Sequence, residues 1–180
     1  MVKNNPNNPC SIEILSNIVP VEVKYLDFDG NYKTGTIEVN KIVTGDVSEF
    51  FKMAFEIKFP INRVAKSSDP EFAWDDSKIM AANASTAFNY RNIAGTDRLS
   101  LHSTGFAFDI NPVQNPYIKY KDGQIFAIEP NGSKHDPFAP GTLTIDHPLV
   151  QFMLDRGWEW GDNWSPESGR IDYQHFQKSN

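Results

Sequence analysis

Two histidines and two aspartates lie in short aromatic-rich runs, and their types and spacing suit a metal site. His102 and Asp109 belong to a segment that contains the alternating run from Phe106 to Ile110, while Asp172 and His175 lie near the carboxyl terminus. A carboxylate among aromatic residues needs a cation or several donors, and a metal ion is the partner that would also use a histidine. The pattern therefore predicts that the two histidines and Asp109 are metal ligands, with Asp172 as general base.

Two histidines and one carboxylate form a common hydrolytic zinc site. Such a site leaves its fourth position to water, whose pKa falls to about 7 on the metal. The other two histidines have different surroundings, because His135 lies in a Lys/Asp-rich loop and His147 lies just inside an expected helix start. We expect neither to contact the metal, and His135 to be solvated, since most histidines are not ligands.

The spacing between His102 and Asp109 also constrains the chain. Residues seven apart would lie on opposite faces of an ideal strand. The chain must therefore turn between the two ligands, and Gly105 is the residue at which it can do so.

A longer pattern connects these residues to a known family. Ser-x-His-x-x-Gly-x-Ala-x-Asp, from Ser100 to Asp109, is followed by Asp-x-x-His, from Asp172 to His175. This combination resembles the D-alanyl-D-alanine carboxypeptidase family of zinc peptidases, which includes VanY-like carboxypeptidases and phage L-alanyl-D-glutamate endolysins. The likeness covers roughly residues 80–177 and includes Gly-Trp-Glu-Trp-Gly at 157–161.

The resemblance implies a fold, a cofactor and roles for particular residues. It implies a hedgehog/D,D-peptidase-like fold, a zinc ion held by the two histidines and Asp109, and Asp172 as general base. In relatives an arginine of a Tyr-Arg pair polarises the scissile carbonyl, which implies that role for Arg91; the alternative is a surface salt bridge, since arginines are usually exposed.

Length and composition are those of one soluble domain. The chain has 180 residues, 39% hydrophobic and 22% charged, which is room for one core. We expect a single α+β domain with a central antiparallel sheet flanked by helices, comprising residues 11–180, after a flexible tail over 1–10. The net charge of −6 argues against nucleic acid as a partner, and the single cysteine, Cys10, excludes an internal disulfide. We expect a monomer.

The amino terminus has no apolar stretch typical of a secretory signal, and no run approaches the ~20 apolar residues of a membrane span. Action on the bacterial cell wall would therefore require release of a cytoplasmic protein or export by another route.

Other patterns predict the elements around the site. Val21–Tyr25 and Thr34–Val39 alternate on either side of Asp29-Gly30-Asn31, which predicts a hairpin; the turn resembles part of a calcium loop but lacks the bidentate glutamate. We further expect a helix with an Asp46/Glu49 capping box and apolar positions over 47–55, followed by a strand over 61–65 and a loop and short helix over 69–84. A long irregular segment is expected over 118–140, where it would border the active site. A helix capped by Asp146 is expected over 147–154.

The tryptophans near the second motif allow two interpretations. Trp158, Trp160 and Trp164 either pack in the core, as large aromatics usually do, or form a wall of the substrate cleft.

Together these patterns predict a zinc peptidase that hydrolyses peptidoglycan stem peptides, with D-alanyl-D-alanine carboxypeptidase preferred over L-alanyl-D-glutamate endopeptidase. The rivals are a non-catalytic zinc-binding recognition module, since fold does not fix function, and a zinc amidase that cuts the sugar–peptide bond. Retention of Asp172 favours an enzyme, because a purely structural zinc needs no spare base.

Overall fold

The computed structural model describes residues 2–161 and 166–179, and its first large element is a β-hairpin. After the single turn of α1 (Ile12–Leu15), strands β1 (Ile18–Leu26) and β2 (Tyr32–Asn40) pair antiparallel along their whole length, which confirms the predicted hairpin. The Asp27 carboxylate accepts backbone hydrogen bonds from Asp29 and Asn31, at 3.0 and 2.8 Å. The acidic turn is therefore explained by its own hydrogen bonds.

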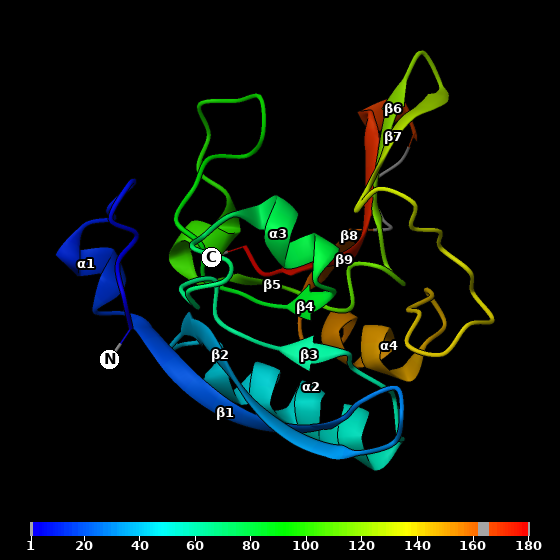
Figure 1. Cartoon of the computed structure of the whole chain (residues 1–180), viewed down its shortest axis with the longest axis horizontal. Helices are drawn as coiled ribbons and strands as arrows, with labels where there is room; N and C mark the ends of the chain where they lie inside the picture. Colours follow the sequence, from blue (N-terminus) through cyan, green and yellow to red (C-terminus); the bar gives the residue numbers. More distant parts are fainter. Residues whose placement is uncertain (1, 162–165, 180) are drawn as a thin grey trace.

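Helix α2 (Thr44–Glu56) packs against the concave side of this hairpin (Figure 1). Its buried residues include Val47, Phe50 and Phe51, as the apolar spacing predicts. The predicted capping box is wrong, because the N-cap is Val43 and no side chain caps the helix. Asp46 instead accepts hydrogen bonds from the Trp158 indole and the Lys178 ammonium, both at 2.9 Å.

Two short strands lie between the hairpin and the main sheet. The strand expected over 61–65 is shorter, since only β3 (Arg63–Val64) pairs, in parallel, with β4 (Ala84–Ser85). Between them α3 (Asp76–Ala81) is the predicted short helix.

The main sheet is antiparallel. In the described part of the chain its order is β5-β9-β6-β7, and β8 also pairs with β9. Its strands are β5 (Ala107–Asp109), β6 (Tyr117–Lys121), β7 (Gln124–Glu129), β8 (Glu159–Gly161) and β9 (Arg170–Gln177).

The prediction of an irregular segment over 118–140 is wrong for its first half. Strands β6 and β7 form a hairpin that projects from the body of the molecule (Figure 1). Asp122 and Gly123 connect them, and both have positive φ, 52° and 74°. Asp-Gly is the residue pair that such a two-residue hairpin turn favours, so the signal was present in the sequence.

Helix α4 (Pro148–Leu154) follows the loop that begins after β7. Its N-cap is His147, whose Nδ1 accepts the Leu149 amide at 3.2 Å, so the prediction of Asp146 as the cap is wrong. Proline at the first helical position fits a cap one residue later than expected.

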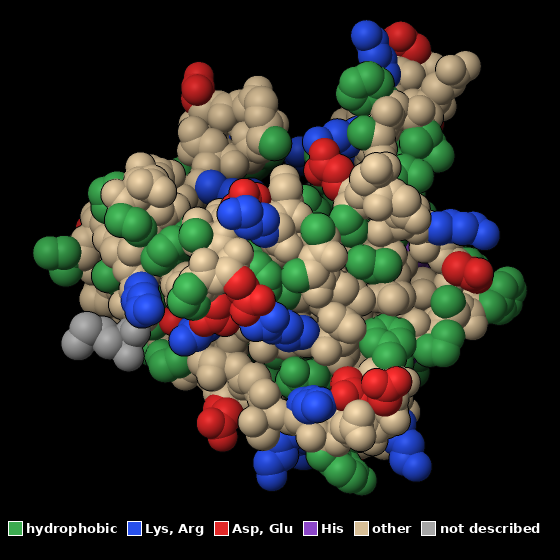
Figure 2. All heavy atoms as spheres, viewed as in Figure 1, with side chains coloured by type: hydrophobic (Ala, Val, Ile, Leu, Met, Phe, Trp, Pro, Cys, Tyr) green, Lys and Arg blue, Asp and Glu red, His purple; other side chains and the backbone are tan. Residues whose placement is uncertain are grey.

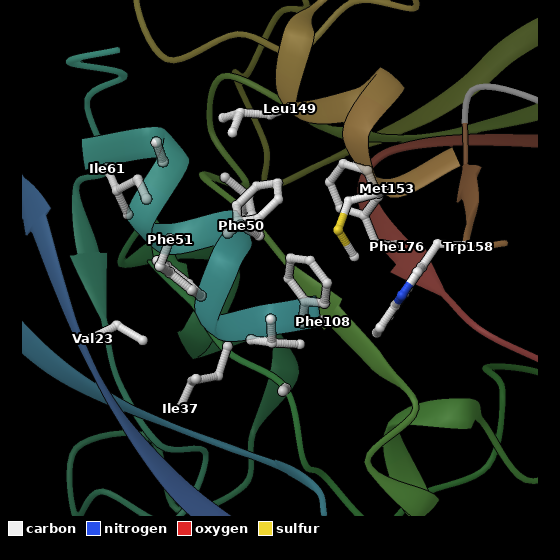
Figure 3. Packing of buried hydrophobic residues seen from close by; sticks show 14 of the residues in the cluster. Val23, Ile37, Phe50, Phe51, Ile61, Phe108, Leu149, Met153, Trp158 and Phe176 are labelled. Atoms are coloured by element: carbon white, nitrogen blue, oxygen red, sulfur yellow. The ribbon is translucent and has the colours of Figure 1, made fainter. Parts of the chain in front are cut away.

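One hydrophobic core connects the hairpin, α2, α4 and the main sheet. Figure 3 shows Phe50 of α2 facing Phe108 of β5, with Phe176 of β9 beside them; the ring centroids of Phe50 and Phe108 are 5.2 Å apart. Trp158 lies in the same cluster, 3% exposed, and Trp160 is 1% exposed. The cleft-wall interpretation is therefore wrong for these two, while Trp164 lies outside the described residues.

The described residues thus form a single small mixed α/β domain, with sheets and four helices, as expected. Residues 2–11 form no helix or strand, but the Asn4 side chain forms hydrogen bonds with both backbone groups of Cys10 at 2.9 Å. The mobility of the segment over 1–10 stays a prediction. No described helix has the length and apolar character needed to cross a membrane.

Candidate metal centre

The sheet register brings the two sequence motifs together. In the pairing of β5 with β9, Asp109 lies opposite His175 and Phe108 lies opposite Phe176. Because side chains alternate along a strand, the phenylalanines enter the core and the polar pair lies on the other face. The Asp109 carboxylate and His175 Nδ1 are 3.0 Å apart.

His102 reaches the same place from a 3₁₀ turn, η1 (Leu101–Thr104), that precedes β5. The Ser100 hydroxyl caps this turn by accepting the His102 amide at 3.3 Å. Gly105 ends it with a φ of 71°, so the chain turns where the spacing predicts. A Cβ at Gly105 would lie 2.5 Å from the Asn40 nitrogen, so no larger residue fits without displacement of the hairpin.

The three predicted ligands form one buried cluster. One ligand atom from each of His102, Asp109 and His175 lies within 4.8 Å of the others. His102 Nε2 is 3.1 Å from His175 Nδ1 and 3.3 Å from Asp109 Oδ2.

Hydrogen bonds at the far side of each ring decide which nitrogen can bind a metal. His102 Nδ1 lies 2.6 Å from the Ala87 carbonyl, and His175 Nε2 lies 3.0 Å from the Gln177 amide oxygen. Both partners only accept, so these nitrogens would keep their protons when the rings bind a metal. The opposite nitrogens face the Asp109 carboxylate, and a metal ion bound there would replace the protons by which the rings contact Asp109. This donor set fits a divalent metal ion.

The protonation equilibria of the cluster are coupled. Burial alone would raise the pKa of Asp109, but the charge of His102 and hydrogen bonds from both histidines hold it well below its ordinary value. Burial alone would lower the pKa of His175, but its hydrogen bond to Asp109 raises it. The carboxylate therefore remains ionised, as a ligand must.

Asp172 lies in the same cleft because β9 is irregular. Residues three apart face opposite sides of an ideal strand, but here β8 advances one residue, from Trp160 to Gly161, while its partner on β9 moves from Phe176 to Asp172. This break in register lets Asp172 and His175 line one cleft.

The Asp172 carboxylate is available for chemistry. Its Oδ1 is buried and has no hydrogen-bond partner among the described residues. Burial raises its pKa to about 6, opposed by the charge of His175 and supported by that of Asp109. A buried carboxylate oxygen with no partner in the described part of the chain, together with a pKa near neutrality, suits a proton acceptor.

Arg91 lines this cleft as well, and two contacts hold it. Its backbone is clamped by Ser103, whose hydroxyl accepts the Arg91 amide at 2.8 Å and donates to its carbonyl at 2.6 Å. Its guanidinium forms an ion pair with Asp76 of α3. Arg91 is therefore both in a salt bridge, as the alternative expected, and at the cleft.

The cleft has a volume of about 600 Å³. It lies between the loop of residues 92–99 and the base of the β6–β7 hairpin, both of which project to the same side of the molecule (Figure 1). Figure 2 shows basic and acidic side chains gathered at the hollow between these two projections. Its lining includes the basic residues Arg91, Arg98, Lys119 and Arg170.

The other two histidines lie apart from the cluster. His135 is partly buried rather than solvated, since its ring stacks on Tyr173 at 3.7 Å between centroids and its Nε2 donates to the Leu143 carbonyl at 2.8 Å. His147 is the cap of α4. Neither belongs to the cluster that could hold a metal.

Two side chains that contact predicted site residues were not predicted from the sequence. Gln177 contacts His175, and its position two residues further on a strand, hence on the same face, could have indicated it. Asp76 pairs with Arg91 across distant segments, and no local pattern indicates that contact.

A buried set of two histidine nitrogens and a carboxylate, with a further carboxylate beside it in a cleft, is the arrangement of a metal-dependent hydrolase. Residues 94–178 match the family model described as D-alanyl-D-alanine carboxypeptidase. Over this segment, the match supports the family that the sequence motifs indicated. No curated protein and no solved structure matches the chain.

Proposed function

We propose that the protein is a zinc-dependent peptidase that cleaves peptidoglycan stem peptides, with D-alanyl-D-alanine carboxypeptidase as its preferred activity. The observation that carries the proposal is the buried Asp172 carboxylate oxygen, without a partner among the described residues, in the cleft that contains the ligand cluster. A structural zinc site has no use for such a group, so it favours an enzyme over a recognition module.

The proposed ligands are His102 Nε2, His175 Nδ1 and the Asp109 carboxylate. Two histidines and one carboxylate also bind ferrous iron in oxygenases, but membership of a hydrolytic family favours zinc. When bound there, zinc would polarise the scissile carbonyl and lower the pKa of a water molecule.

Proton transfer and stabilisation of the developing charge are assigned to residues of the chain itself. Asp172 would take the proton from the attacking water and deliver it to the leaving amine, for which a pKa of about 6 is suitable. Arg91, oriented by its ion pair with Asp76, would donate hydrogen bonds to the carbonyl oxygen as negative charge develops on it.

The cleft lining carries both basic and acidic side chains, and two of the basic ones, Arg91 and Lys119, form ion pairs with Asp76 and Glu129. Arg98 extends from the loop into the lining, and no acidic side chain in the described ranges pairs with it. A guanidinium group at this position could bind a substrate carboxylate.

The test is product analysis by mass spectrometry with the zinc-loaded protein, a free stem peptide and its C-terminal amide. A carboxypeptidase releases D-alanine from the acid only, because it needs the free carboxylate. Equal cleavage of acid and amide would assign the endopeptidase instead. Release of intact stem peptides from purified peptidoglycan would indicate an amidase, and no cleavage of any substrate would favour the recognition module.

A further inference from the structure

One polar contact of His175 lies on the side away from the ligand cluster. His175 Nε2 is 3.0 Å from Gln177 Oε1. The two residues are two apart on β9, so both lie on the sheet face opposite Phe176. An amide oxygen only accepts, so it would hold the proton on Nε2 when Nδ1, which faces Asp109, binds a metal.

A second residue fixes which way the Gln177 amide points. Its Nε2 donates to Glu159 Oε2 at 2.7 Å, and Glu159 lies opposite Gln177 in the pairing of β8 with β9. A reversed amide would set its oxygen against the carboxylate and its NH₂ against a ring N–H. Both contacts would be repulsive.

The Glu159 carboxylate is itself held from the other side, because the Ser179 hydroxyl donates to its Oε1 at 3.3 Å. The hydrogen bonds thus run in one direction, from the His175 ring to Gln177 and from Gln177 to Glu159. Partners of this kind, behind a ligating histidine, set its tautomer and ring orientation and raise its basicity.

We propose that Gln177 and Glu159 are positioning residues of the metal centre, which hold His175 in the tautomer that presents Nδ1 to the metal. The inference rests on the proposed function only in that it takes His175 as a ligand. Its competitor is that Gln177 and Glu159 form an ordinary cross-strand pair that stabilises the sheet edge.

The test is the zinc dissociation constant of the metal-free protein, measured by competition with a chelating dye. Gln177→Leu should raise it by about 10–100-fold, the usual effect of losing such a partner. Glu159→Ala, at an exposed position, should raise it by a smaller factor, because Gln177 remains but its amide is free to rotate. The matched control is Gln124→Leu on β7, outside the cleft lining, which should leave the constant unchanged.

A double variant separates positioning from sheet stability. In Gln177→Glu/Glu159→Gln the new carboxylate can accept from both His175 and the new amide, so an acceptor still faces His175 although the hydrogen bond between positions 177 and 159 is reversed. Zinc affinity should return to within a few-fold of wild type. A cross-strand pair alone predicts no dependence of zinc affinity on these residues.

The outcomes distinguish this inference from the proposed function. If the wild type binds zinc and both Gln177→Leu and Glu159→Ala bind it equally well, the positioning role is overturned and the metal centre stands. If the wild type binds no zinc, the proposed function fails and the inference fails with it. Should Gln177→Leu not fold, Glu159→Ala and the double variant decide the matter.

Discussion

Asp109 lies directly opposite His175 in the antiparallel pairing of β5 with β9, and their side chains approach to 3.0 Å. The neighbouring pair, Phe108 and Phe176, stacks in the core with centroids 5.1 Å apart. A register shift of one residue would move every side chain to the other face of the sheet. The aromatic core therefore fixes the register on which the candidate metal centre depends.

The role of Asp172 can be separated from metal binding by Asp172→Asn, which keeps the size of the side chain. We expect zinc to remain bound while the turnover number falls by roughly 100-fold or more, as is usual when a general base is lost. Elemental analysis and peptide hydrolysis measure the two properties. Unchanged turnover would remove Asp172 from the mechanism, and loss of zinc would make it a ligand.

Gly161 is required by the close approach of β8 to Asp172. A Cβ there would lie 2.1 Å from the Asp172 carbonyl oxygen, so Gly161→Ala must displace the backbone that carries the base. We expect a loss of about 1–3 kcal/mol in the free energy of unfolding, as for other overpacked sites, together with a fall in turnover.

The matched control for this glycine is Gly45→Ala in α2, where a Cβ would meet nothing within 4 Å. It should leave turnover unchanged and stability equal or slightly higher, because alanine favours a helix. Urea unfolding of both variants provides the comparison; equal stability of Gly161→Ala and wild type would show that the backbone at Asp172 adjusts freely.

Glu38 predicts a pH dependence of stability away from the site. This residue of β2 is 4% exposed, and burial raises its pKa to about 7, against the opposing charge of Lys66. A carboxyl whose pKa is higher in the folded state stabilises the fold at low pH. That contribution is lost as the pH rises from its ordinary value of 4.5 through about 7.

Glu38→Gln should therefore be more stable than wild type at pH 8, by about 3 kcal/mol, and should have almost no advantage near pH 4.5. Urea unfolding at the two pH values measures this, with Glu22→Gln, at an exposed position of β1, as the control. If the free energy of unfolding of Glu38→Gln has the same pH dependence as that of wild type, Glu38 is not the group responsible for it.

Arg91→Lys tests what the guanidinium does in the cleft. If Arg91 stabilises charge that develops on the scissile carbonyl, the turnover number should fall more than the Michaelis constant rises, because lysine lacks the paired donors. A change mainly in the Michaelis constant would instead assign Arg91 to a substrate carboxylate. Arg156→Lys, which lies outside the cleft lining, should change neither constant.

Much of the candidate site could be predicted from the sequence, because its proposed ligands occur in two compact motifs. His102, Gly105 and Asp109 are close in the chain, and the turn at Gly105 follows from their spacing alone. The family match over 94–178 supports the class of protein that those motifs indicated.

The contacts between distant segments could not be predicted in this way. Asp46 and Trp158 illustrate the reason. The sequence predicted Asp46 as a helix cap and allowed Trp158 as a cleft wall, but the Trp158 indole donates a hydrogen bond to the Asp46 carboxylate, 112 residues away in the chain. The break in register that directs Asp172 into the cleft depends on how β8 pairs with β9, and no local pattern encodes it. The Asp122-Gly123 turn is a different case, because its Asp-Gly pair is a local indication of a hairpin. The polar composition of the surrounding residues led instead to the prediction of an irregular segment.

The most direct test of the central claim is hydrolysis of a free stem peptide, followed by mass spectrometry, before and after metal removal. Wild-type protein stripped with a chelator should lose cleavage, and one equivalent of zinc should restore it, whereas His175→Ala should not recover at any zinc concentration used. Full cleavage by the stripped wild-type protein, with no zinc detectable by elemental analysis, would contradict the assignment of this cluster as a catalytic metal centre.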